Sequence, residues 1–127
     1  MSTKRILVID DEFAVLKIIE ASLKLTRQWE VLVAESGKEG LAIAQTERLD
    51  AILLDVMMPG MNALAILKEL NKSSMTQAIP VILLTATVEI AKQPDYVQSG
   101  AKAVVIKPFD PELLPVQIET VLGWSSE

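Results

Sequence analysis

The stretch AILLDVMMPGM, residues 51–61, is an apolar run of strand length that ends in a carboxylate and is followed at once by a turn. Pro59 cannot donate a hydrogen bond to a central ladder and Gly60 accepts a positive φ, so the strand has to end near Asp55. The sequence therefore predicts a single acid at the mouth of a buried strand. Taken alone, such an acid more often simply begins a turn, so its meaning depends on the partners that other strands bring to it.

Composition excludes several classes of function. The 127 residues fit one domain, and 12 Lys and Arg against 17 Asp and Glu give a net charge of −5, which disfavours direct binding to nucleic acid. Cysteine and histidine are both absent from the sequence, so a metal here would be a hard cation on oxygen ligands, with Mg²⁺ the leading candidate. No segment approaches membrane-spanning length, and we expect a cytoplasmic protein that does not act on membranes.

Five short apolar runs without polar alternation recur along the chain, and this pattern is typical of parallel strands covered on both faces. Amphipathic patterns alternate with them, which predicts a doubly wound α/β domain that fills residues 1–127. The expected strands cover residues 5–9, 31–34, 51–55, 81–85 and 103–106.

The intervening patterns predict helices over residues 13–25, 36–46, 62–70, 94–99 and 110–122. Ser36 and Asn62 are the expected N-caps of the second and third helices. Pro94 opens the short fourth helix, and residues 87–93 before it are expected to form a loop or a frayed turn. Asp110 is the expected N-cap of the last helix, where Pro115 predicts either a distorted first turn or a later start.

A polar residue directly follows each expected apolar run. In parallel α/β sheets, ligands bind beyond the carboxyl ends of the strands, where the strand order reverses. If the strand order is 2-1-3-4-5, all of these residues meet in one pocket except Glu35, which ends the outer strand. The residues are Asp10 and Asp11, Glu35, Asp55, Thr85 and Lys107.

Three carboxylates in one pocket repel one another, and a divalent cation on oxygen ligands would remove the conflict. Together with Thr85 and Lys107, they are the parts that in-line phosphoryl transfer needs, and the product would be an aspartyl phosphate on Asp55. Each residue also has an ordinary explanation: a helix cap, a β-forming threonine or a solvated lysine. The coincidence of all of them at the ends of the right strands favours the phosphoryl-transfer interpretation.

Four motifs carry a family resemblance: VIDDE at residues 8–12, LDVMMPGM at 54–61, LTA at 84–86 and KPF at 107–109. With them the chain resembles the receiver domain of bacterial two-component response regulators, and in particular the single-domain, chemotaxis-regulator-like members. The resemblance spans essentially the whole chain. It implies a flavodoxin-like (βα)5 fold with a five-stranded parallel sheet of order 2-1-3-4-5.

The resemblance also implies roles for single residues. Asp55 would be the phosphoacceptor, and Thr85 and Lys107 would each bind a phosphoryl oxygen. Asp10, Asp11, Asp55 and the backbone carbonyl of Met57 would hold Mg²⁺. The Lys107–Pro108 peptide bond would be cis.

The implied partners are a sensor histidine kinase or a histidine phosphotransfer protein as donor, and a downstream protein as target. A phosphorylation-dependent dimer is a second form of output that the family allows. The protein would catalyse only its own phosphorylation and dephosphorylation. Because the printed sequence ends four residues after Gly123, we expect a single-domain regulator.

Three departures from the family pattern concern output. Val104 stands where receivers usually carry an aromatic residue whose side chain reports the state of the threonine. Asn62 and Ala63 replace the usual Asp-Gly, and Pro94 shortens or displaces the fourth helix. We therefore expect the fourth helix and the loop before it to transmit the signal.

Two alternative functions remain. A phosphatase of the haloacid dehalogenase type shares the Asp, Thr, Lys and Mg²⁺ set, but it needs an acid two residues after the nucleophile, where this chain has Met57. A degenerate receiver that acts only as a constitutive binding module is the other. Val104 favours that alternative, and the intact acids argue against it.

Overall fold

A computed structural model describes residues 3–57, 62–86, 89 and 92–124 of the chain. The strands are β1 (Arg5–Ile9), β2 (Glu30–Ala34), β3 (Ala51–Asp55), β4 (Val81–Thr85) and β5 (Ala103–Ile106). The helices are α1 (Phe13–Arg27), α2 (Gly37–Thr46), α3 (Ala63–Lys72), α5 (Pro94–Val97) and α6 (Leu114–Leu122).

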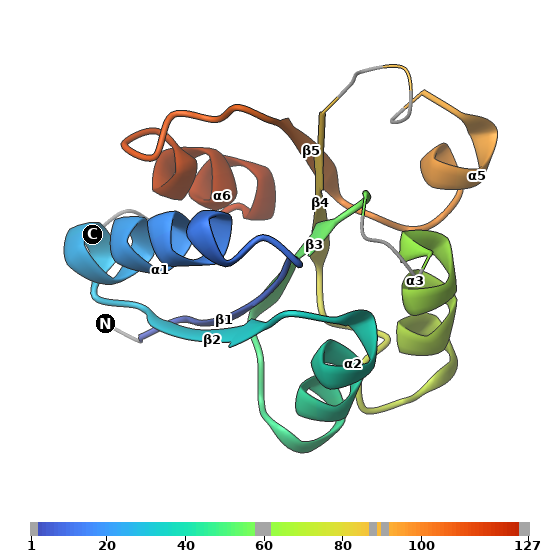
Figure 1. The fold of residues 1–127 in the computed structure, drawn as a ribbon. Coiled ribbons are helices and arrows are strands. Elements are labelled where there is room, and N and C mark those ends of the chain that lie inside the picture. The colour runs from blue at the N-terminus through green and yellow to red at the C-terminus, as the bar shows by residue number, and fades with distance from the viewer. Residues whose placement is uncertain (1–2, 58–61, 87–88, 90–91, 125–127) are drawn as a thin grey trace.

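The strands form one parallel sheet in the order β2-β1-β3-β4-β5. Helices α1 and α6 lie on one face of the sheet, and α2 and α3 lie on the other (Figure 1). The predicted doubly wound α/β fold and its strand order are confirmed. The turn predicted at Pro59 and Gly60, and most of the expected loop over residues 87–93, lie outside the described residues.

Alternate residues of the strands enter two separate apolar cores, because successive side chains of a strand point to opposite faces. Leu7, Ile52 and Leu83 belong to the core under α2 and α3. Val8 and Leu53 belong to the core under α1 and α6. Burial on both faces explains why the strands read as unbroken apolar runs.

The predicted caps of the second and third helices are confirmed. Ser36 Oγ accepts a hydrogen bond from the backbone N–H of Glu39 at 3.1 Å. Asn62 Oδ1 accepts one from the backbone N–H of Leu64 at 2.8 Å. Each cap satisfies one of the N–H groups that have no partner within the helix.

The start of the last helix differs from one expectation and agrees with another. Asp110 is not its N-cap, because helix α6 begins at Leu114 after a turn. In that turn the Asp110 carbonyl accepts hydrogen bonds from the N–H groups of Leu113 and Leu114, each at 3.0 Å. The later start suits Pro115, which then lies in the first helical turn, where its missing N–H costs no hydrogen bond.

Helix α5 is also shorter than expected. It ends at Val97 rather than near Ser99, and Gly100 follows with a left-handed φ of 91°. Within the part of the chain that the structure describes, no helix has both the length and the apolar character needed to cross a membrane.

Helix α1 is joined to α6 by an ion pair as well as by the core, and an aromatic contact lies just beyond the ends of the two helices. Arg27 and Glu119 form a two-pronged ion pair, with Nε to Oε2 at 2.9 Å and Nη2 to Oε1 at 3.1 Å. The rings of Trp29 and Trp124 meet edge to face with their centroids 5.3 Å apart. These contacts stiffen the face of the sheet that α1 and α6 cover.

Helix α2 approaches β1 closely at Gly40. A Cβ atom at this position would overlap Cδ1 of Ile9 and lie 2.7 Å from its Cγ1. Ile9 is buried and directly precedes Asp10. The small residue in α2 therefore helps to fix the end of β1.

We expect Gly40→Ala to lower the free energy of unfolding by about 1 to 2 kcal/mol, because overpacking outweighs the better helix propensity of alanine. Chemical denaturation measures the change. Ile9→Val relieves part of the clash, so the double variant should lose less than the sum of the two single variants, by at least about 0.5 kcal/mol. Strict additivity would show that Gly40 is not held by contact with Ile9.

Candidate phosphoryl-transfer site

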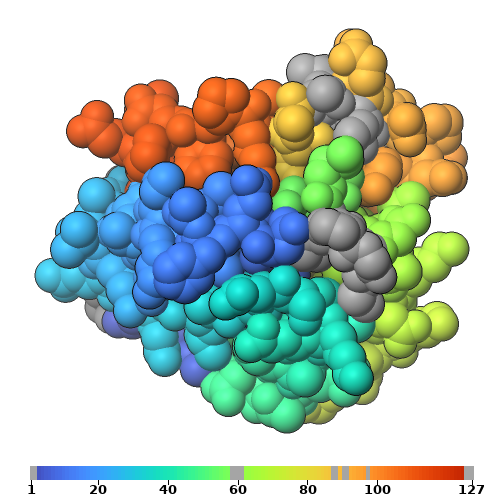
Figure 2. Space-filling model, in the orientation of Figure 1, coloured from blue at the N-terminus to red at the C-terminus, as the bar shows by residue number. Residues whose placement is uncertain are grey.

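The candidate site lies where four neighbouring strands end. Asp10 follows β1, Asp55 ends β3, Thr85 ends β4 and Lys107 follows β5. On the surface, the blue start of α1, the green segment after β3 and the yellow segment after β4 lie on one side of the molecule (Figure 2). The order of the strands therefore brings together residues that are far apart in the sequence.

Backbone hydrogen bonds continue past the strand ends and fix the site residues. The N–H of Asp10 donates to the carbonyl of Ala34 at 3.1 Å, and the N–H of Lys107 donates to the carbonyl of Thr85 at 2.7 Å. After Asp55, the N–H of Val56 donates to the carbonyl of Leu84 at 2.9 Å. The side chains of the site thus project from backbone that the sheet holds in place.

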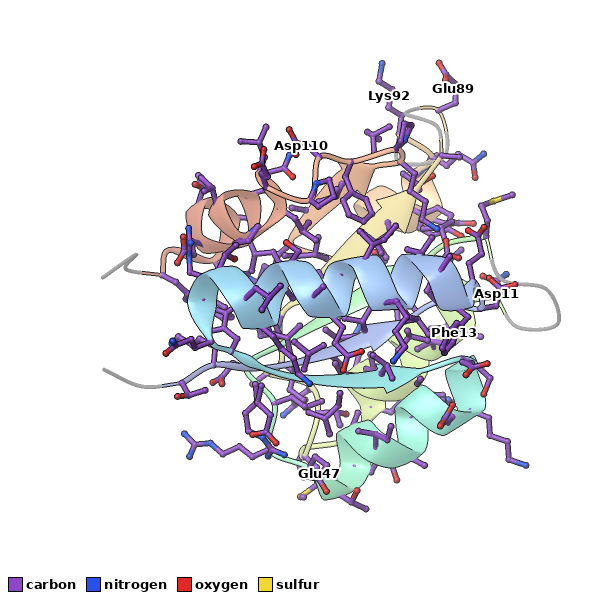
Figure 3. All side chains as sticks on the ribbon, turned by 60° about the vertical axis from the view of Figure 1, so that its left-hand side comes forward. Asp11, Phe13, Glu47, Glu89, Lys92 and Asp110 are labelled. Atoms are coloured by element: carbon purple, nitrogen blue, oxygen red, sulfur yellow. The ribbon has the colours of Figure 1, made fainter. Side chains whose placement is uncertain are left out.

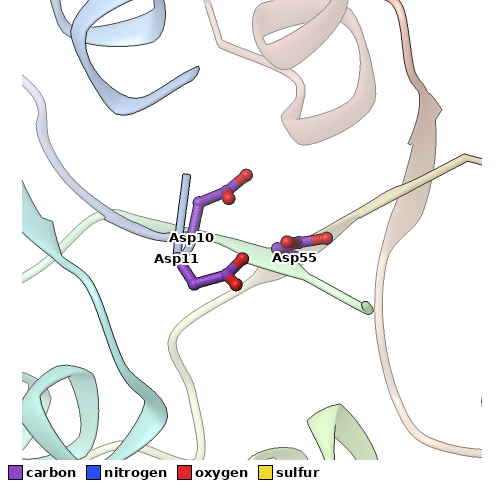
Figure 4. Close-up of side chains that lie close together, drawn as sticks. All are labelled: Asp10, Asp11 and Asp55. Atoms are coloured by element: carbon purple, nitrogen blue, oxygen red, sulfur yellow. The ribbon is translucent and has the colours of Figure 1, made fainter. Parts of the chain in front are cut away.

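Three carboxyl groups form the centre of the site. Asp10, Asp11 and Asp55 each offer an oxygen, and these oxygens lie within 4.8 Å of one another (Figure 4). Asp10 and Asp55 are fully buried, at 0% and 1% exposure, whereas Asp11 is exposed. Asp11 lies at the start of α1, near Phe13 (Figure 3). The predicted convergence of the three acids is therefore observed.

This donor set fits a hard divalent cation. Carboxylate oxygens are the ligands that Mg²⁺ prefers, and the exposed Asp11 leaves one side open to the water molecules that Mg²⁺ retains. The acids also need a cation for electrostatic reasons, because two of them are buried beside each other.

Lys107 supplies positive charge to the acids, and its closest acidic partner is Asp10. Its Nζ lies 2.9 Å from Asp10 Oδ2 and 3.4 Å from Asp55 Oδ1. The ammonium therefore bridges the two buried carboxylates, because both need a counter-charge. The Lys107–Pro108 peptide bond is cis, as expected.

Glu12 is a further residue of the site. Its Oε1 lies 3.4 Å from Lys107 Nζ, and its side chain is 63% exposed. Its backbone N–H donates to Asp10 Oδ1 at 2.9 Å. Glu12 belongs to the VIDDE motif, but no role was predicted for it from the sequence. The sequence did hold a signal for such a role, because Glu12 is the third consecutive acid after the first strand.

Burial raises the pKa of the Asp55 carboxyl above its ordinary value, and the nearby charge of Asp10 adds to this. The N–H of Met57, which donates to Asp55 Oδ1 at 3.1 Å, and the Lys107 ammonium act in the opposite direction without overcoming burial. For Lys107, burial would lower the pKa, but the contacts with Asp10 and Asp55 outweigh it and raise the pKa. The ammonium therefore stays charged at neutral pH.

The remaining predicted residues lie where the strand order requires. Thr85 is buried, at 1% exposure, at the end of β4, the strand beside β3. Met57 is 60% exposed, two residues beyond Asp55. Glu35 is exposed after the edge strand β2, and its N–H donates to Glu39 Oε1 at 2.9 Å. It thus stays outside the three-acid cluster, as expected.

Comparisons with known proteins agree with this geometry. Residues 6–119 match the family model of the response regulator receiver domain. PilH of Pseudomonas aeruginosa is 36% identical over 119 residues, which cover 94% of this chain and 98% of PilH. A probable transcriptional regulator, ycf27, of Cyanophora paradoxa is 38% identical over 96% of this chain. The chain spans about half the length of the ycf27 proteins that it matches, 49% in this case.

Solved structures give the same result. The chemotaxis response regulator CheY4 of Vibrio cholerae superposes with a TM-score of 0.87 at 30% identity, over 94% of this chain and 99% of that one. The receiver domain of a sensor histidine kinase from Pseudomonas aeruginosa superposes with a TM-score of 0.82 at 26% identity, over 96% of this chain and 99% of that one. The latter structure has a magnesium ion coordinated in its active-site cleft.

We expect Asp55→Asn to raise the stability of the metal-free protein, because a neutral amide does not add charge to the buried acids. The free energy of unfolding at neutral pH should rise by an amount on the order of 1 kcal/mol, the usual scale for an incompletely compensated buried polar group. Denaturation in the presence of a chelator measures it.

The exposed Asp11 provides the control, since Asp11→Asn should give a smaller increase than Asp55→Asn. Excess Mg²⁺ should stabilise the unaltered protein more than the Asp55→Asn variant, because a ligand stabilises the state that binds it. A destabilised Asp55→Asn variant in the metal-free protein would contradict the electrostatic argument.

Proposed function

We propose that this chain, which belongs to the response regulator receiver domain family, accepts a phosphoryl group on Asp55 and signals by binding another protein. It is a phosphoacceptor module of the kind used in two-component systems. The observation that carries the residue assignment is a buried Asp55 carboxylate with two acids within 4.8 Å and an ammonium at 3.4 Å.

Asp55 is the nucleophile in this proposal. Its carboxylate oxygen forms a bond to the phosphorus of a phosphohistidine, the phosphorus–nitrogen bond of the donor breaks, and the electron pair leaves with the imidazole. The N–H of Met57 orients the carboxylate by donating to its Oδ1. The sheet holds Asp55 still, and this positioning lowers the entropic cost of the transfer.

Asp10, Asp11 and Asp55, with the backbone carbonyl of Met57, are the groups that we assign to Mg²⁺. When bound, Mg²⁺ neutralises the charge of the transferring phosphoryl group. The carboxylates of Asp10 and Asp11 would hold the ion next to the acceptor oxygen of Asp55. The closeness of their oxygens supports this assignment.

Thr85 and Lys107 bind the other phosphoryl oxygens in this proposal. The hydroxyl of Thr85 donates a hydrogen bond, and the Lys107 ammonium changes partners from the Asp10 carboxylate to the phosphoryl group. Its observed distance of 3.4 Å from Asp55 Oδ1 supports the second role, because only a small movement is needed.

The proposed donors are a sensor histidine kinase or a histidine phosphotransfer protein, and the proposed target is another protein reached in the cytoplasm. The net charge of −5 disfavours direct contact with nucleic acid. PilH is matched over nearly its whole length and the ycf27 regulators over about half of theirs, so the activity of the complete protein is itself part of the proposal.

Output through α5 and the segment before it completes the proposal. Val104 is half-buried and packs against the same core as Tyr96, which lies in α5. A valine has one stiff side-chain torsion and cannot swing as an aromatic ring does. Displacement of Tyr96 and its helix is therefore the proposed response to movement at Thr85.

Incubation with acetyl phosphate and Mg²⁺ tests the proposed phosphorylation. The intact mass should increase by one phosphoryl group, and both a chelator and the Asp55→Asn variant should abolish the increase, because each removes a required part. An unchanged mass in the unaltered protein would favour the constitutive binding module instead. A gain that survives in Asp55→Asn would assign the phosphoryl group to another residue.

Hydrolysis of the aspartyl phosphate should be slow, because the exposed thioether of Met57 cannot orient an attacking water molecule. We expect Met57→Asn, whose amide can hydrogen-bond water beside the phosphoryl group, to speed the loss of the phosphoryl group by about tenfold. The decay of the phosphorylated mass after donor removal measures the rate. Met57→Leu is the matched control and should change it little.

A decay within seconds in the unaltered protein would contradict this prediction. Equal rates for Met57→Asn and Met57→Leu would show that residue 57 does not control access of water to the phosphoryl group.

A further inference from the structure

We propose that Glu12 sets the choice of phosphodonor, by disfavouring small anionic donors relative to a phosphohistidine on a docked protein. This inference rests on the proposed function, because it concerns transfer to Asp55. The proposed cause of this preference is the negative charge of the Glu12 carboxylate at the solvent-exposed side of the acceptor pocket. This carboxylate is paired with the Lys107 ammonium, which the incoming phosphoryl group needs.

The position of Glu12 places this charge next to the reaction. Its Oε1 and the Oδ1 of Asp55 each lie 3.4 Å from the same Lys107 nitrogen. The two oxygens are therefore within about 7 Å of each other, a range over which charges interact strongly. Glu12 lies in the sequence between Asp11 and Phe13, the two residues labelled at the start of α1 in Figure 3.

A role in folding does not account for Glu12. It is the N-cap residue of α1, but its side chain makes no capping hydrogen bond. Its ion pair with Lys107 is open to solvent on the Glu12 side, where the side chain is 63% exposed, and such pairs contribute little to stability. Asp10 differs, because its fully buried carboxylate both binds Lys107 and accepts the N–H of Glu12.

The effect of the charge depends on the charge of the donor. A free donor that is a dianion is repelled by Glu12 as it enters, and it competes with Glu12 for Lys107. A phosphohistidine on a partner protein meets the same charge, but the contact between the two proteins supplies binding free energy that offsets the repulsion. Glu12 thereby favours donors that dock.

Two small donors of different charge test the inference. Acetyl phosphate is mainly a dianion at neutral pH, and phosphoramidate is mainly a monoanion. With saturating Mg²⁺ and low ionic strength, Glu12→Gln should raise the second-order rate constant by about fivefold for acetyl phosphate and about twofold for phosphoramidate. In about 0.5 M salt both increases should fall toward unity, because salt screens exposed charges.

Matched variants separate this local effect from net charge. Glu30→Gln changes the net charge equally, but Glu30 is paired with Arg5 at the opposite end of β1, so both rate constants should stay the same. Glu12→Asp keeps the charge and should stay close to the unaltered protein. Glu12→Ala should reproduce Glu12→Gln, which makes the result independent of the properties of the amide.

Equal increases for the two donors, increases that persist in high salt, or unchanged rates in Glu12→Gln would each overturn the inference while Asp55 remains the acceptor. If the unaltered protein takes no phosphoryl group on Asp55 from either donor, the proposed function fails and the inference fails with it. The two failures are therefore distinguished by the unaltered protein alone.

Discussion

Two buried carboxylates, those of Asp10 and Asp55, need a positive charge beside them, and the order of the strands brings the Lys107 ammonium to that place. Asp10 and Asp55 are almost completely excluded from solvent, yet their oxygens lie within 4.8 Å. Burial of like charges at this distance is costly unless a positive charge joins them. The Lys107 ammonium does so, and it can reach both acids only because β5 lies beyond β4 in the sheet, with its carboxyl end at the same edge.

Most of the fold could be predicted because its signals are local. Unbroken apolar runs mark strands buried on both faces, and Ser36 and Asn62 cap helices through hydrogen bonds that span two or three residues. The start of α6 at Leu114 was harder to predict. There the turn after Asp110 competes with a cap at the same residue, and the outcome depends on packing of the helix on the sheet.

The sequence predicted which residues meet in the candidate site, but it did not predict which of them form ion pairs with one another. Parallel strands bring their ends to one edge, so the acids, Thr85 and Lys107 had to meet once the order was known. The preference of Lys107 for Asp10 could not be predicted in this way. A long flexible side chain chooses among several acids by burial and distance, and Asp10 lies 97 positions away from it in the sequence. The contact of Glu12 with Lys107 could not be predicted either, because it depends on where the Lys107 side chain lies in the folded protein.

The two faces of the sheet differ in how firmly their helices are attached, and this bears on where a signal can leave. On one face, the Arg27–Glu119 ion pair joins α6 to α1, and the rings of Trp29 and Trp124 meet just beyond the C-terminal ends of these helices. On the other side of β4, α5 is a single turn, and a hydrogen bond from Asn71 Nδ2 of α3 to the carbonyl of Ser99 holds the segment just after it. Moving α6 would break the partly buried Arg27–Glu119 pair, whereas the contacts of α5 among the described residues are the packing of Tyr96 on the core and the hydrogen bond at Ser99 just after the helix. This difference supports the proposed output through α5, because a movement at the end of β4 would disturb fewer fixed contacts there, and a stiff Val104 would not prevent it.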